Sequence, residues 1–120
     1  MLVPNSITIA VGTVNTTPAN RLLIANALVN RWVRAVYATN TTAASIDLTA
    51  GMGAAAILTV ANADFAFAAP IPAKATSYPV AQYAGQGMKG LGVGSLNELM
   101  GFASATGLLI KFVYSDDTLA

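Results

Sequence analysis

The chain has 120 residues, of which 55% are hydrophobic and only 9% charged, and its six basic and five acidic side chains leave a net charge of +1. Because a typical soluble domain is about 25% charged, much of this surface must consist of small polar residues or of apolar side chains that another molecule covers. Histidine and cysteine are absent, which excludes a Ser-His-Asp triad, disulfides and thiolate chemistry. The length fits one domain, so we expect residues 1–120 to form it, with short flexible termini.

The first predicted element is a strand over residues 6–14. Ile7, Ile9 and Val11 lie on one side of it, and Ser6 and Thr8 lie on the other. This period-2 alternation of β-prone residues is typical of a half-buried strand. A turn-rich segment, 15–20, follows.

Residues 21–39 allow two interpretations. Asn26, Asn30 and Arg34 recur every four residues, which would draw a polar stripe on a helix. Residues 32–37, in contrast, are rich in β-branched and aromatic side chains. We favour two strands, near 22–28 and 31–39, and keep the helix as the alternative. A turn at 40–42 comes next.

The second half of the chain also predicts short strands, at 45–49, 56–60, 64–67 and 108–114. Asp116 and Asp117 are expected to stop the last strand and to form a solvated cap on it. Ser95 to Glu98 matches the spacing of a capping box, so a short helix is allowed there. The expected fold is therefore an all-β, single-domain antiparallel β-sandwich, jelly-roll-like, with a short helical turn allowed near 18–30 or 95–103.

The segment 85–94 is the one glycine-rich loop. It fits G-x-G-x-x-G literally, but it lacks an acidic residue about 20 positions on and the βαβ units of a dinucleotide site. We interpret it as a mobile loop at an assembly contact, in which Lys89 offers a charge to an acidic partner. The predicted assembly contacts are Gly85, Gly87, Met88, Lys89, Gly90 and Leu91.

Catalytic, metal and nucleic-acid functions find little support in the residues. Glu98 is the only glutamate, and Asp47 and Asp64 are far apart in the chain, whereas hydrolysis needs two carboxylates or a nucleophile with its base. We predict no enzyme, no cofactor and no metal. The basic residues are scattered, which argues against nucleic acid, and no apolar run is long enough for a membrane helix. Trp32 and Tyr37 are expected in the core.

Residues 31–48, RWVRAVYATNTTAASIDL, resemble a pattern of small tailed-phage virion proteins, in which a strand ending in T-N-T turns into a second strand through small residues. The turn IPAKAT at 71–76 and the segment FASATG at 102–107, leading into a final strand at 108–114, look similar too. The resemblance covers about 16–114 and implies a β-sandwich or jelly roll that decorates heads or builds tails and fibres. It brings no catalytic residues.

From the resemblance and the sparse charge we expect a virion structural protein, made in the host cytoplasm. The first hypothesis is an oligomeric capsid decoration (cement) protein that contacts the major capsid protein or other virion proteins, without nucleic acid or membrane. The alternative is a tail, neck or fibre component, or a carbohydrate-binding β-sandwich module. That last function would need an exposed aromatic side chain, for which the candidates are Tyr78, Tyr83 and Tyr114.

Overall fold

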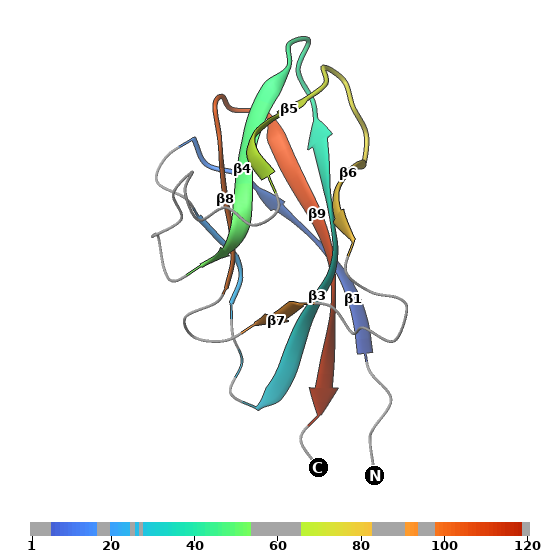
Figure 1. Cartoon of the computed structure of the whole chain (residues 1–120). Helices are drawn as coiled ribbons and strands as arrows, with labels where there is room; N and C mark the ends of the chain where they lie inside the picture. The colour runs from blue at the N-terminus through green and yellow to red at the C-terminus, as the bar shows by residue number, and fades with distance from the viewer. Residues whose placement is uncertain are drawn as a thin grey trace.

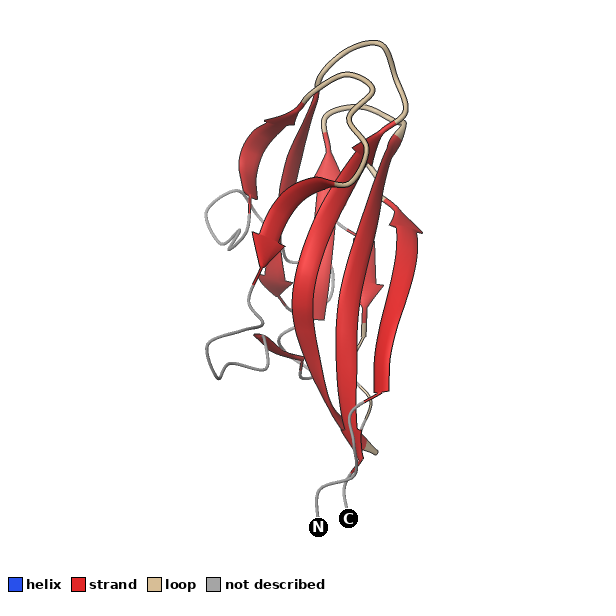
Figure 2. Cartoon of the chain, turned by 90° about the vertical axis from the view of Figure 1, so that its right-hand side faces the viewer, coloured by secondary structure: helices blue, strands red, loops and turns tan. Residues whose placement is uncertain are grey.

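The chain folds into two antiparallel sheets packed as a β-sandwich, which confirms the predicted fold class (Figures 1 and 2). The computed structural model describes residues 6–16, 20–24, 26, 28–53, 66–82, 91–93 and 98–118, which contain no helix. Sheet A has the order β1 (Ser6–Thr13), β9 (Leu108–Thr118), β3 (Val29–Asn40) and β6 (Tyr78–Gln82), with β7 (Leu91–Val93) also paired to β3. Sheet B has the order β2 (Asn20–Leu23), β8 (Glu98–Ala103), β4 (Ile46–Gly53) and β5 (Ala66–Ile71).

The strand order is that of a jelly roll. The antiparallel pairs β1–β9, β2–β8, β3–β6 and β4–β5 are nested within one another along the sequence. Successive pairs belong alternately to sheet A and sheet B, as in the eight-stranded jelly roll. The short β7 is an addition to this scheme, and it lies beside β3.

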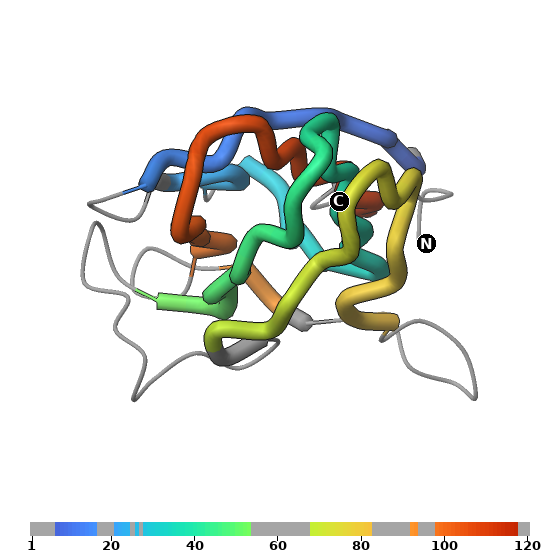
Figure 3. The backbone as a smooth tube through the Cα atoms, turned by 90° about the horizontal axis from the view of Figure 1, so that it is seen from above, coloured from blue at the N-terminus to red at the C-terminus, as the bar shows by residue number. Residues whose placement is uncertain are grey.

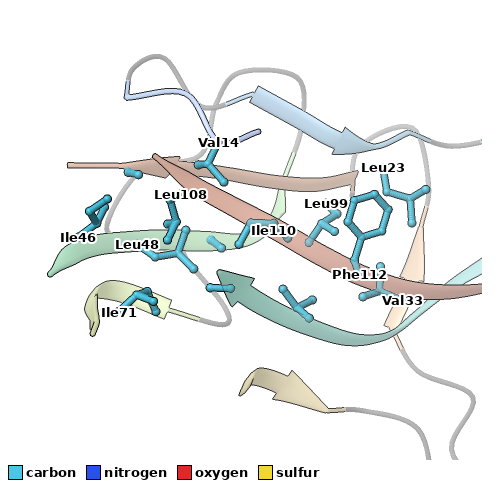
Figure 4. Close-up of a cluster of buried hydrophobic side chains, with 14 of the residues drawn as sticks. Val14, Leu23, Val33, Ile46, Leu48, Ile71, Leu99, Leu108, Ile110 and Phe112 are labelled. Atoms are coloured by element: carbon cyan, nitrogen blue, oxygen red, sulfur yellow. The ribbon is translucent and has the colours of Figure 1, made fainter. Parts of the chain in front are cut away.

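The core lies between the two sheets (Figure 4). In β4, every second residue points inward, and Ile46, Leu48, Ala50 and Met52 all belong to the buried cluster. The inward residues of β9 meet them from the other sheet: Leu108, Ile110 and Phe112. The alternation that predicted strands at 45–49 and 108–114 is confirmed, because each strand hides one face in this cluster.

The helical interpretation is wrong for the described residues of 18–30 and 95–103. Residues 20–23 form β2 and residues 98–103 form β8, and the two strands pair with each other. Packing overrides the helical spacing, since this pairing buries Leu23 opposite Leu99. The strand predicted at 22–28 ends at Leu23, and the Leu28 N–H donates to Asn26 Oδ1 at 2.9 Å in a local turn.

The last strand does not stop at the paired aspartates, as the sequence had suggested. β9 runs on to Thr118, because β3 supplies a partner for each carboxylate. The Arg31 Nε–H donates to Asp116 Oδ1 at 2.8 Å, and the Trp32 Nε1–H donates to Asp117 Oδ2 at 3.2 Å. Asp117 is buried, so the pair is not a solvated cap.

The remaining predicted elements are either confirmed, outside the described residues, or, for β5, longer than predicted. The strand at 31–39 lies within β3, and the turn at 40–42 follows the end of β3, so both are confirmed. The strand predicted at 56–60 and the two termini, 1–5 and 119–120, lie outside the described residues, as do residues 64 and 65. β5 begins at Ala66 and extends to Ile71, further than predicted.

Candidate assembly surface

The apolar side of β1 faces solvent. Ala10 packs against the core, and a Cβ on Gly12 would lie 3.0 Å from Leu22 Cδ2, so the even-numbered residues of β1 point inward. The odd-numbered residues point outward, and three of them, called the β1 row from here on, are 60%, 64% and 63% exposed: Ile7, Ile9 and Val11. The predicted alternation is correct, but its apolar side is the exposed one.

The apolar character of this face continues onto the neighbouring strands. Val113 of β9 lies opposite Ile9, and Lys111 lies opposite Val11. On the far side of β9, Ala35 and Tyr37 of β3 pair with the same two residues. The Lys111 Nζ lies 5.5 Å from the centroid of the Tyr37 ring, so the charged residue in this part of the face is held over an aromatic ring.

Trp32 and Tyr37 also belong to the outer side of sheet A, not to the core. Both are partly buried, and neither is a member of the buried cluster between the sheets. Trp32 lies opposite Ser115 of β9 and hydrogen-bonds Asp117 two residues further on. The prediction that the two rings sit in the core is wrong, because alternation turns Val33 and Val36 inward and leaves both rings on the opposite face of β3.

The β1 strand is the margin of sheet A (Figure 2). Seen from above, it runs in blue along the rim of the molecule (Figure 3). In the described part of the chain, it pairs with β9 on one side and with no strand on the other. The Val14 N–H donates to Leu108 O at 3.2 Å, which extends the β1–β9 ladder by one position.

That hydrogen bond determines which backbone groups of β1 face outward. In an antiparallel ladder, every second residue pair exchanges its hydrogen bonds. Because Val14 bonds to β9, so do residues 12, 10, 8 and 6 in the same register. The N–H and C=O groups of Ile7, Ile9 and Val11 therefore point to the open edge, and the same residues supply the exposed side chains.

The other sheet margins carry features that discourage further pairing, and β1 carries none. Edge strands are usually protected by charges, prolines or bulges. β2 has Arg21 and an irregular register, β5 has Pro70, and β6 has Pro79 with a second irregularity. β7 is only three residues long, and a very short edge strand offers little to pair with. Residues 6–13 contain no charge and no proline, and their pairing with β9 is regular throughout.

Two ion pairs neutralise four of the chain's charged side chains, although Arg21 itself stays exposed. Arg21 holds Glu98 through its Nε and one terminal nitrogen, at 2.9 and 3.0 Å, and Glu98 is buried. Arg31 holds Asp116 in the same two-pronged way, at 2.8 and 2.9 Å, and its guanidinium lies 4.9 Å from the centroid of the Tyr114 ring. Each hydrogen-bonded carboxylate raises the pKa of its arginine, because the bonds stabilise the charged guanidinium.

A second feature is an open pocket of about 390 Å³ on sheet B. Phe102 and the exposed Asp47 belong to its lining. The Ser104 hydroxyl accepts a hydrogen bond from the Asp47 N–H at 2.9 Å, and the Thr49 hydroxyl accepts one from the Ala68 N–H at 3.1 Å. Each hydroxyl keeps its hydrogen for a further acceptor, so the pocket combines an aromatic ring with donors and a carboxylate.

Most of the sequence-predicted contact residues cannot be placed. Gly85, Gly87, Met88, Lys89 and Gly90 lie outside the described residues. Leu91 opens β7 and pairs with Val33, so the predicted loop 85–94 is wrong at 91–93. The surface on β1 was missed, although its charge-free, proline-free sequence was a signal that could have indicated it.

The candidate tyrosines are spread over the fold. Tyr78 is 41% exposed at the start of β6, Tyr114 is partly buried against the core, and Tyr83 lies outside the described residues. Glu98, the one glutamate, is engaged by Arg21, and Asp64 lies outside the described residues. The described tyrosines therefore form no shared platform.

Comparison with known proteins found no matching family model, no matching curated protein and no matching solved structure. Within the described residues, no three metal-binding side chains gather at one place. A search of the same residues for a helix of membrane-spanning length and hydropathy found none. The functional argument therefore depends on the geometry of the chain itself.

Proposed function

We propose that this protein is a phage virion structural protein, an oligomeric decoration protein that stabilises the capsid by binding to its outer shell. The observation that carries the proposal is the β1 row, a line of exposed apolar side chains on a strand whose backbone edge is open. Contiguous exposed apolar surface rimmed by polar residues marks interaction sites. Coverage by other proteins also explains the shortage of charged residues, because a surface hidden from water needs few charged side chains.

The free energy gained by covering the β1 row fits a protein that binds through several contacts at once. Covering three side chains that are 60–64% exposed contributes about 1–2 kcal/mol each, or about 3–6 kcal/mol per copy. Association costs an estimated 4–15 kcal/mol in lost freedom. One such row therefore binds weakly by itself. In a particle, where each copy touches several neighbours, the contacts act together and hold it firmly.

The fold is compatible with this role. Jelly rolls occur in viral capsid proteins and also in lectins, so the fold alone is an analogy that does not choose between functions. The resemblance of residues 31–48 to small phage virion proteins favours the first. A tail, neck or fibre position would use the same surface, and antibody labelling of intact particles would distinguish it from a head position.

Co-sedimentation with empty shells tests the proposal. Empty shells are assembled from the major capsid protein of the phage that encodes this chain, and purified protein is added in increasing amounts. We expect saturable binding by the natural chain and by Ala73→Lys, an exposed control away from β1, and loss of binding by Ile9→Lys. If the natural chain stays in the supernatant at every ratio, the decoration role is wrong.

The pocket on sheet B favours carbohydrate binding as a second candidate function. An aromatic ring beside a carboxylate and hydroxyl donors can pack against the apolar face of a sugar and accept bonds from its hydroxyls. Glycan-array binding that disappears in Phe102→Ala and in Asp47→Asn would support it. Binding that survives both changes would place any glycan elsewhere.

A further inference from the structure

We propose that the open edge of β1 pairs with β1 of a second copy of this chain, in antiparallel register about a two-fold axis that passes beside Ile9. The inference rests on the assembly role proposed above and names the partner at one of its surfaces. Pairing would join the two A sheets into one continuous sheet across the axis. The β1 row of each copy would then lie against the β1 row of the other.

The register follows from the backbone groups that face outward. Ile7, Ile9 and Val11 turn their N–H and C=O groups to the open edge, so these residues must form the bonded pairs of any new ladder. Two two-fold registers satisfy this rule with all three residues bonded. One pairs Ile9 with Val11 and Ile7 with the polar Thr13, and we favour the other, which pairs the apolar residues of the β1 row only with one another. It places Ile9 opposite Ile9 of the second copy, and Ile7 opposite Val11 in both directions.

The side chains fit the same register on both faces. On the outer face, each β-branched side chain meets another of similar size, a favourable cross-strand pairing. On the inner face, Thr8 meets Ala10 of the second copy, and both are small enough to let the strands approach. The strand carries no charge, so bringing two copies together opposes no like charges.

A second copy suits this edge better than an unrelated strand. In an antiparallel two-fold contact both subunits use the same surface patch, so the patch only has to be complementary to itself. β1 has this property because its exposed row is apolar from end to end and almost uniformly exposed. Of the sheet margins longer than three residues in the described part of the chain, it is also the one without a proline, a charge or an irregular register.

Single cysteines test the register directly, because the natural chain has none. In an antiparallel bonded pair the Cα atoms are about 5.5 Å apart, which lies within the range that a disulfide spans. We expect Ile9→Cys to form a covalent dimer on mild oxidation, and an Ile7→Cys and Val11→Cys mixture to form the mixed dimer. Thr13→Cys is the control on the same strand and face, because its two copies would lie roughly 27 Å apart.

Sedimentation velocity of the natural chain and of Ile9→Lys completes the test. We expect a concentration-dependent dimer for the natural chain and a dissociation constant about 100-fold higher for Ile9→Lys, because two side chains lose their cover and two cations meet. A natural chain that stays monomeric overturns the inference, as does equal cross-linking of Thr13→Cys and Ile9→Cys, or a dimer in which Ile9→Cys does not cross-link. Because no shell is present, failure of the decoration role leaves these results unaffected.

Discussion

Replacing the whole β1 row by threonine should destabilise the isolated protomer only slightly. Threonine keeps the β-branched shape that suits a strand, so the change removes mainly apolar contact. The three side chains are 60%, 64% and 63% exposed, so each loses roughly two-fifths of the 1.5–3 kcal/mol that full burial provides. The methyl group that threonine retains offsets part of this, which leaves a total of about 2 kcal/mol.

A single substitution on the inner face provides the matched control. Ile110 is fully buried between the sheets, so Ile110→Ala should cost about 2–5 kcal/mol by itself. One inward change would therefore match or exceed three outward ones. The difference between the two losses of unfolding free energy depends on which face of β1 points outward, and it does not involve any partner molecule.

Urea unfolding at concentrations where the chain is monomeric measures both variants. The fluorescence of Trp32, the one tryptophan, reports on the contact between β3 and β9. If the triple threonine variant lost more than about 5 kcal/mol, the β1 row would have to be buried. The assignment of the exposed face would then be wrong, and with it both proposals built on it.

Three further predictions concern stability. Gly107 has a φ of +107°, and a Cβ there would lie 2.4 Å from Thr42 Cγ2, so Gly107→Ala should cost at least about 1–3 kcal/mol in thermal unfolding. Gly92→Ala, whose Cβ would make an ordinary contact at 3.5 Å, is the control, and an equal loss in both would refute the reasoning. Asn40 is buried and its side-chain amide forms four hydrogen bonds, two of them to backbone carbonyls at 2.8 and 3.0 Å. Asn40→Ala should therefore cost about 2–4 kcal/mol in urea unfolding, and a loss below about 1 kcal/mol would contradict this. The free energy of unfolding should be level between about pH 6 and 9, because the chain has no histidine or cysteine to titrate there. The Asp116 hydrogen bond raises the pKa of Arg31, so this stabilisation is complete below the ordinary arginine pKa and declines only as pH rises through the folded value. Unfolding at three pH values tests this, and a change above about 1 kcal/mol across the range would show a titrating group that the argument has missed.

The paired aspartates show how a local rule can fail. Adjacent charges near a chain end usually mark a solvated segment, which is why the sequence predicts that the strand ends before Asp116. The partners that keep the strand going, Arg31 and Trp32, lie 85 residues away in the sequence. No pattern within a short window can reveal a partner at that distance. The same is true of Glu98, which is buried only because Arg21 comes from a neighbouring strand.

The candidate surface on β1 is not the one that the sequence analysis predicted. The shortage of charge indicated surface that something covers, and the exposed β1 row agrees with that expectation. The location was assigned to the glycine-rich loop, since glycines are conspicuous in a sequence. An unprotected strand edge is inconspicuous, because it is recognised by residues that are missing, namely charges and prolines.

The amino-acid sequence determined the class of fold, since period-2 alternation separated by turn residues can bury one face only as strands in packed sheets. Alternation also gave β1 its two distinct sides. Which side faces inward was decided by the tertiary structure alone: Leu22 and Phe112 already fill the space beneath Gly12, so the inner face of β1 accepts small residues and the larger Ile7, Ile9 and Val11 are left outside.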